Sequence, residues 1–489
     1  MAASHRLAGV LLVLAAIVYL ASGSIVPDSH DTTANAYIPV SLLGDGDLAF
    51  GALEAPLMFL WKAKDAQGTT PVYVQSWAHR LPGSDITFGA AHHQGILQFA
   101  GPRYFLVRTI RTRAGSGEPL FVGAFGPVAG LTALPVMALA WLCGADLQQD
   151  AFAVFRAAKW SAALLAAGSV ALVFLAAAAL TTQGHALALA LLYAFGSCIW
   201  TISSQALWQQ TPELFFFALG ALCIVRTERP WLRGAAAGLA FSAAAACRPT
   251  AAIVALVAAA YLLLSERRAA IAYLAAAAPA LLGVLAYNQY YFGAPYEFGQ
   301  FAAGAAIAAS KTGSSELWQT PWHVGAAGLL LSPSRGLLVY SPFFAAAFVG
   351  AVLVWRDPKY ERLRFLAVAV PLLWLPAFLW FDWWGGWTYG YRPIVDSTPL
   401  LALLCVPAID RLATRAVWGA AFVAAAIWSL FVQLLGVAAY QPEEWNARTF
   451  ADTSTAANID LPQYRSRLWS LTDWQIGYLI QKCAGATSR

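Results

Sequence analysis

Long apolar stretches alternate with short polar turns along most of this chain. A bilayer core about 30 Å thick takes about 20 apolar residues to cross as a helix. Eleven stretches approach this length, the first from Leu7 to about Ser22. The others are 158–181, 185–203, 211–226, 233–247, 250–264, 270–287, 337–355, 365–381, 397–409 and 415–438. The pattern predicts an all-α polytopic membrane protein with about eleven transmembrane helices.

Composition narrows the class further. Apolar residues make up 60% of the 489 positions and charged residues only 11%, whereas soluble domains are nearer half apolar and a quarter charged. Disorder, a nucleic-acid module and an ordinary cytosolic enzyme are therefore poor fits, and the first partner to expect is the lipid bilayer. The net charge of +5 is mild and requires no acidic partner.

The first apolar stretch has two interpretations. The small residues at 21–24 would suit the cleavage site of a signal peptide. Because many further spans follow, we favour an uncleaved first helix.

The region 23–157 has the charge density of a folded aqueous domain. Within it, the segment Phe121 to Cys143 is apolar but is interrupted by Gly126, Pro127, Gly130 and Pro135. We expect this segment to form a re-entrant or interface-lying helical pair that does not cross the membrane.

The basic residues of the short turns support this choice. If Phe121 to Cys143 does not cross, eleven of them fall on the side of the N-terminus, against four in the far-side loops. The eleven are Arg226, Arg229, Arg233, Arg267, Arg268, Arg356, Lys359, Arg362, Arg364, Arg411 and Arg415, and the four are Arg248, Lys311, Arg335 and Arg392. Cytoplasmic loops carry an excess of Lys and Arg, so we expect the N-terminus in the cytoplasm.

This topology divides the chain into four parts. They are a first transmembrane helix (1–22), an outer-facing loop with juxtamembrane or re-entrant helices (23–157), a transmembrane bundle (158–439) with outer loops 288–336 and 382–396, and an outer-facing C-terminal tail (440–489).

Unusual polar clusters all fall at the outer ends of the predicted spans. Such groups are costly near the membrane, so their placement indicates function. The stretch 381–393 combines Trp and Tyr with Gly, one acid and one Arg, a mixture that suits sugar rings and prenyl chains. Trp and Tyr also gather at membrane interfaces without any specific task.

Two acids follow the first span closely. A carboxylate shielded from bulk water, such as Asp28 or Asp31, can accept a proton from an incoming hydroxyl. The alternative is a helix cap or a solvated loop acid, since the sequence after Asp31 suits a cap.

Three arginines are candidates for binding a phosphate, because the guanidinium fork matches phosphate oxygens. Arg248 ends an Ala-rich helix and could equally serve as an interface anchor. Arg335 lies in a Ser- and Gly-containing turn, and Arg392 follows the aromatic stretch.

Familiar catalytic motifs are missing. The sequence contains no Walker A motif, dinucleotide-binding glycine pattern after a strand, HExxH or GxSxG. The six cysteines lack metal-ligand spacing, so we expect no zinc site and read them as small core residues.

The order of these features resembles the GT-C superfamily of membrane glycosyltransferases, which includes protein O-mannosyltransferases and lipid A aminoarabinose transferases. The chain is most similar to bacterial members described as family-39-like. The resemblance covers most of the chain and is carried by the order and spacing of seven stretches. They are DSHDTTANAYIPVSLLGDGDL (28–48), FGPVAGLTALPVMALAWLCG (125–144), SSQALWQQTPELFFF, GLAFSAAAACRPT, YNQYYFGAPYEFG, LLLSPSRGLLVYSP and WWGGWTYGYRP.

The resemblance implies a polyprenyl-phosphate-linked sugar donor, an envelope glycan, glycolipid or protein acceptor, and inverting transfer at the outer face of the inner membrane. It implies that the early loop acid is the general base, which by position is Asp31, with Asp28 as competitor. The chain lacks the family's usual Asp-Glu pair there, which leaves the exact base and the dependence on a divalent metal open. Candidates for the sugar or acceptor pocket are Glu297, Trp384, Trp387, Tyr389, His92 and His93.

Two other functions compete with the transferase. A transporter or flippase of a lipid-linked or small polar solute would place charges and broken helices near mid-membrane. A non-catalytic scaffold of envelope assembly would tolerate replacement of both early acids. The sugar, the acceptor, the prenyl length and the oligomeric state are not encoded in any recognisable motif.

Overall fold

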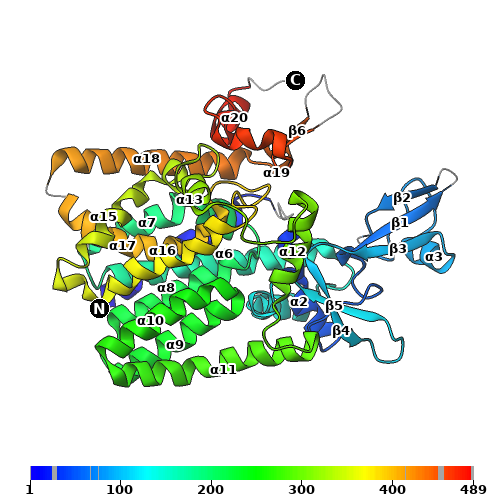
Figure 1. Ribbon diagram of the computed structural model, residues 1–489, viewed down its shortest axis with the longest axis horizontal. Helices are drawn as coiled ribbons and strands as arrows, with labels where there is room; N and C mark the ends of the chain where they lie inside the picture. The colour runs from blue at the N-terminus through cyan, green and yellow to red at the C-terminus, as the bar shows by residue number, and fades with distance from the viewer. Residues whose placement is uncertain are drawn as a thin grey trace.

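A computed structural model describes residues 2–24, 30–65, 68–74, 76–412, 415–449 and 456–485. Most of these residues are helical and form one bundle. A smaller strand-containing part lies at one end of the bundle, and a C-terminal module packs against the bundle at α18 (Figure 1). The chain is thus a helical protein of the membrane type.

The bundle contains long helices joined by tight turns. Its elements are α1 (Ala2–Ala21), α6 (Ala151–Ala177), α7 (Gln183–Phe195), a π-helical turn η3 (Ile199–Ser203), α8 (Gln210–Arg226), α9 (Pro230–Cys247), η4 (Pro249–Ala251), α10 (Ala252–Ser265), α11 (Arg267–Phe292), α13 (Trp322–Leu331), α14 (Leu337–Tyr340), η5 (Pro342–Phe344), α15 (Ala345–Leu353), η6 (Pro358–Leu363), α16 (Arg364–Leu379), η7 (Arg392–Ser397), α17 (Thr398–Leu412) and α18 (Ala416–Ala439).

Six helical segments among the described residues are long and apolar enough to cross a membrane. They are Ala3–Ala21, Ala151–Ala177, Arg267–Phe292, Pro358–Leu379, Arg392–Arg411 and Ala416–Ala439. Other bundle helices are shorter, and α8 and α9 pack between α6 and α11. The expectation of a helical membrane protein is confirmed, whereas the count of eleven spans stays a prediction.

The turns that carry most of the basic residues lie at one end of the bundle. Arg233 pairs with Glu266 at 2.6 Å, and Arg362 donates to the carbonyl of Val225 at 2.8 Å. This is also the end at which α1 begins, and the strand-containing part lies at the opposite end (Figure 1). Because successive helices run in opposite directions, the turns with most of the basic residues lie together at this end, as the sequence pattern predicts.

The region between α1 and α6 differs from the all-α expectation, because it contains strands. Its elements are η1 (His30–Thr32), α2 (Thr33–Gly44), η2 (Pro56–Met58), β1 (Phe59–Asp65), β2 (Gly68–Val72), α3 (Phe88–His93), β3 (Leu97–Pro102), β4 (Leu106–Thr112), β5 (Pro119–Gly123), α4 (Val128–Leu131) and α5 (Leu134–Leu142). The antiparallel sheet has the order β2-β1-β3, and β4 pairs with β5.

The residues of β1 explain why a sheet forms here. Phe59, Trp61 and Ala63 are buried, while the residues between them, Leu60 and Lys62, are exposed. This alternation has the period of two that a half-buried strand requires. Charge density alone indicated an aqueous domain but did not reveal the alternation.

The ambiguous segment Phe121 to Cys143 forms the end of β5 followed by the two short helices α4 and α5. Neither helix is long enough to cross a bilayer. Leu139 and Leu142 of α5 are 62% and 76% exposed, as expected of a helix in contact with lipid or the interface. Its membrane placement stays a prediction.

Two further parts of the chain lie at the end of the bundle that carries the strand-containing part (Figure 1). One is α12 (Gly299–Thr312), which follows α11. The other is the C-terminal module, which consists of α19 (Pro442–Asn446), β6 (Ala447–Thr449), β7 (Ala456–Asn458), η8 (Pro462–Trp469) and α20 (Gln475–Cys483). Helix α20 packs against α18.

Glycines set the distance between neighbouring helices of the bundle. A Cβ at Gly234 of α9 would overlap the carbonyl oxygen of Ala269 in α11, and one at Gly238 would overlap that of Tyr273. Small residues allow such close approach, which gives membrane helices much of their packing energy.

We predict that Gly234→Val lowers the stability of the protein by about 1–3 kcal/mol, the usual cost of overpacking. Gly283 is the matched control, because it lies in α11 and a Cβ added there would have no other atom within 4 Å. Thermal unfolding of the detergent-purified variants measures the difference. Equal melting temperatures for Gly234→Val and Gly283→Val would contradict the close packing of α9 on α11.

Candidate functional site

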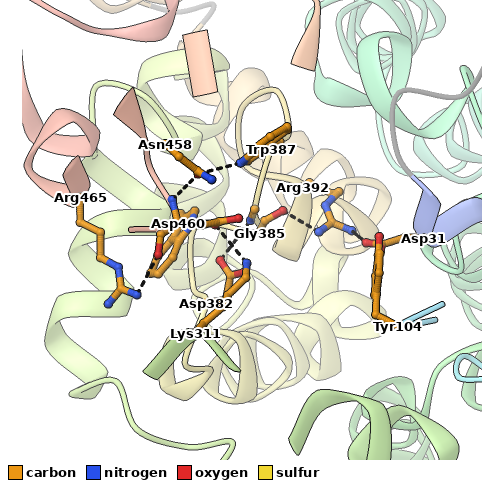
Figure 2. Close-up of polar contacts among 12 residues, drawn as sticks. Asp31, Tyr104, Lys311, Asp382, Gly385, Trp387, Arg392, Asn458, Asp460 and Arg465 are labelled. Carbon is orange, nitrogen blue, oxygen red and sulfur yellow. Dashed lines mark hydrogen bonds and ion pairs between the residues drawn. The ribbon is translucent and has the colours of Figure 1, made fainter. Parts of the chain in front are cut away.

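The carboxylate of Asp31 lies where the strand-containing part meets the bundle. Asp31 belongs to η1, which follows α1 along the chain, and Thr32 occupies the N-cap position of α2. The hydroxyl of Tyr104, from the turn between β3 and β4, donates to Asp31 Oδ1 at 2.7 Å. Arg392 Nη1 lies 3.2 Å from Asp31 Oδ2 (Figure 2). Two candidate residues are thus brought together.

Arg392 is held by groups other than Asp31. Its Nη2 donates to the carbonyl of Gly385 at 2.6 Å, and its guanidinium lies 4.6 Å from the ring centroid of Trp208. Its Nε is buried and has no hydrogen-bond partner among the described residues. The side chain is therefore oriented in advance by contacts other than Asp31.

The loop that presents Gly385 connects α16 to η7. Gly385 and Gly386 have φ values of 74° and 68°, which residues other than glycine rarely adopt. The amide of Gly386 donates to Asp382 Oδ1 at 3.0 Å. Glycine thus permits the tight turn that directs a backbone carbonyl at Arg392.

Lys311 of α12 anchors this loop to the C-terminal module. Its Nζ lies 2.7 Å from Asp382 Oδ2 and 3.0 Å from Asp460 Oδ1. Burial disfavours the charge on Lys311, but the two carboxylates outweigh burial and raise its pKa above the usual value. Asp460 also accepts from the Trp384 indole at 3.1 Å. The charged lysine thereby joins three segments distant in sequence.

A polar and aromatic cleft adjoins Arg392 through the shared residue Trp208. Its lining comes from the residues after α1, from η3, from the end of α18 and from the aromatic loop (380–391), which joins α16 to η7. The space within the cleft is about 600 Å³, including open solvent at its mouth. Gln205 Oε1 and Thr388 Oγ1 near its wall are buried without a hydrogen-bond partner among the described residues. The cleft can therefore accept hydrogen bonds from the hydroxyls of a ligand.

A second, mostly apolar cleft lies between the β5–α4 turn and the ends of α9, α11 and α12, and its space is about 420 Å³ including open solvent at its mouth. Its walls include Pro249, Tyr287 and Phe292. Its lining suits a hydrocarbon chain.

Arg248 does not face an open cleft alone but belongs to a buried ionic triad. It pairs with Asp396 of η7, and its Nη1 lies 3.8 Å from Glu213 Oε2 of α8. The Glu213 side chain is completely buried, and its oxygens accept no hydrogen bond among the described residues. Since Asp396 and Arg392 lie on the same short helix, the triad adjoins the Asp31 site.

Arg335 is fully buried within the fold. Its guanidinium donates to the carbonyls of Trp384, Ser334 and Gly386 and to the side chains of Gln475 and Asn446, at 2.7–3.2 Å. These partners belong to the aromatic loop, the turn before α14 and the C-terminal module. The arrangement is that of a structural tie, which leaves little capacity for a phosphate.

The remaining candidates are scattered. Trp387 lines the polar cleft, and its indole donates to Asn458 at 3.1 Å. Trp384 is buried, and the guanidinium of Arg465 lies over its ring. Tyr389 is buried, and its hydroxyl donates a hydrogen bond to the carbonyl of Val432. The structure thus brings Trp387 to the site and uses the other two aromatic residues in packing.

Three pocket candidates lie away from Asp31. His92 contacts the rings of Trp61 and Trp77 on the outer sheet, and His93 follows it on α3, at the far tip of the molecule (Figure 1). Glu297 is exposed in the loop before α12. Asp28, the competing base, lies outside the described residues.

No protein-family model matches this chain, and no curated protein matches it either. The assignment of a function therefore depends on the geometry of the site and on the resemblance in sequence pattern. Among the described residues, no group of three or more His, Cys, Asp or Glu side chains is arranged to hold a metal ion.

Sequence reasoning missed several members of this site. Tyr104 carried no signal, because an isolated tyrosine in a charged loop has no periodic or motif context. Glu213 carried a usable signal, since it is an acid at the start of an apolar segment. Lys311 was counted only as a far-side basic residue.

We predict that Arg335→Lys destabilises the protein by about 3 kcal/mol or more, because several buried acceptors lose their donors. Arg111→Lys is the control, since exposed Arg111 donates through Nε to only one backbone carbonyl. Thermal unfolding in detergent measures both. A melting temperature of Arg335→Lys equal to that of the control would show that the buried network is dispensable.

Proposed function

We propose that this protein is an inverting glycosyltransferase that moves a sugar from a polyprenyl-phosphate donor to a hydroxyl acceptor at the outer face of the bacterial inner membrane. The observation that supports it is the pairing of Asp31 with Arg392 beside a polar, aromatic cleft. One residue can accept a proton and the other can bind a phosphate, and transfer from a phosphate-linked sugar requires both.

In this reaction Asp31 accepts the proton of the acceptor hydroxyl. The acceptor oxygen then forms a bond to the anomeric carbon, while the bond from that carbon to the phosphate oxygen breaks. The electron pair leaves with the phosphate, and attack from the opposite side inverts the configuration. Tyr104 orients the carboxylate through its 2.7 Å hydrogen bond.

The departing phosphate needs positive charge close to its oxygens, and preorganised donors make the largest contribution to such catalysis. Arg392 is the first candidate, since it contacts a single acid among the described residues and lies beside the polar cleft. Arg248 is the second, because its guanidinium is shared between two acids. Arg335 is the weakest candidate, because its donors already have acceptors.

The polar cleft is the proposed place of the sugar or acceptor. Trp208, Trp387 and Tyr440 provide aromatic faces, and Gln205 and Thr388 provide buried acceptors. Rings with polar edges and apolar faces fit such a lining.

The proposed orientation follows from the basic turns. They gather at the end of the bundle opposite to Asp31, and cytoplasmic loops are rich in Lys and Arg. The candidate site would then face outward, with the N-terminus in the cytoplasm.

We predict that Asp31→Asn lowers turnover of a polyprenyl-phosphate sugar by about 10²–10⁴-fold, the usual contribution of a general base. Binding of the donor should not be lost, because the substitution keeps the size of the side chain. Turnover by purified protein in detergent measures the effect, with Asp28→Asn as the competing variant. Asp85→Asn is the control, since Asp85 pairs with Arg80 on the exposed surface.

Transport of a lipid-linked or small polar solute is the second candidate function. It is favoured by the triad of Glu213, Arg248 and Asp396, because buried charge within a helical bundle is typical of transporters. A transporter would require the triad and not Asp31.

We expect Glu213→Gln to leave movement of a fluorescent prenyl-phosphate lipid across proteoliposome membranes at the rate of protein-free vesicles, as in wild type. Reduction of the outer-leaflet label by dithionite measures that rate. Wild-type protein that accelerates the movement, with Glu213→Gln abolishing the gain, would replace the transferase with a transporter.

A further inference from the structure

We infer that Arg392 has two alternative partners, the carboxylate of Asp31 and the phosphate of the lipid-linked donor. The donor must take Arg392 from Asp31, and only then is Asp31 released to receive the proton of the acceptor. This inference rests on the proposed function and adds an order of binding to it, with the donor first.

The contacts of Asp31 provide the first argument. Its Oδ1 accepts from Tyr104 at 2.7 Å, and its Oδ2 is paired with Arg392 at 3.2 Å. Each oxygen keeps a second lone pair, so an acceptor hydroxyl can still donate to it, but the carboxylate remains in an ion pair with Arg392 until another anion takes that arginine. The ion pair is the replaceable partner, because a phosphate offers Arg392 an equivalent charge.

The other contacts of Arg392 keep it in place during such an exchange. The carbonyl of Gly385 and the ring of Trp208 hold the guanidinium independently of Asp31. Its side chain is 15% exposed, so a ligand can reach it.

The neighbouring cations are more heavily committed. Arg248 is shared between two acids, and Lys311 lies between two others. Arg335 donates to five oxygens. Among the described residues Arg392 has one acid partner. A phosphate that binds to Arg392 therefore displaces fewer ion pairs than one that binds to Arg248 or Lys311.

The expected effect of replacing Asp31 on donor affinity is an increase. Replacing the proposed base should strengthen donor binding, because Arg392 no longer has a competing anion. A plain repulsion between Asp31 and a phosphate would have the same sign. The two causes separate in a double-mutant cycle, since competition requires Arg392 and repulsion does not.

The probe is farnesyl methyl phosphate, a prenyl phosphodiester with one negative charge. Its affinity is measured by calorimetry on full-length protein in nanodiscs for wild type, Asp31→Asn, Arg392→Gln and the double variant. We expect Asp31→Asn to bind about fivefold to tenfold more tightly than wild type, and Arg392→Gln to bind about tenfold more weakly. In the Arg392→Gln background, Asp31→Asn should change the affinity less than about twofold.

The exposed pair Arg80–Asp85 supplies matched controls, and neither Arg80→Gln nor Asp85→Asn should alter affinity. Arg392→Lys replaces Arg392→Gln if the latter does not fold, and should reduce the gain from Asp31→Asn.

Three results would overturn the inference. They are an equal gain from Asp31→Asn in both backgrounds, no gain in either, and no binding of the probe to any variant. The proposed function is judged separately by turnover, so an intact cycle without turnover would reject the transferase and retain the exchange of Arg392.

Discussion

The ion pair between Asp31 and Arg392 joins two parts of the chain that are 361 positions apart. One partner follows the first helix, and the other begins the helix η7 that leads into α17. The pair can form only if α1, the aromatic loop and the strand-containing part all meet at one end of the bundle. Close helix packing at glycines and the clamp of Lys311 on two acids both serve that meeting.

Polar groups at this end are arranged by how much water they lose. Arg335, Glu213 and Asp396 are buried, and burial of charge is tolerated only where partners compensate for it. Arg248, Arg392 and Asp31 keep 12%, 15% and 19% exposure of their side chains. A ligand can therefore compete only where a charged side chain combines some exposure with few partners, as Arg392 does.

The sequence predicted the parts of this protein that depend on local pattern. Apolar stretches of sufficient length became helices, and the interrupted segment 121–143 became a strand end and two short helices. The strands were missed, because the alternation at Phe59, Trp61 and Ala63 is short and lies among charged residues. The site was predicted only in part: Asp31 and Arg392 were both named, but their contact depends on tertiary folding, and Tyr104 had no sequence signal.

The three arginines show why residue type alone does not identify a phosphate site. Arg335 and Arg392 lie near Gly, Ser or aromatic residues and Arg248 ends an Ala-rich helix, and the sequence made all three candidates for a phosphate. In the fold, Arg335 donates to five oxygens and Arg248 contacts two acids, whereas Arg392 contacts one acid among the described residues. Binding an anion costs an arginine the partners that it must leave. The capacity of a cationic side chain for a ligand therefore depends on the partners that it already has, which only the tertiary structure determines.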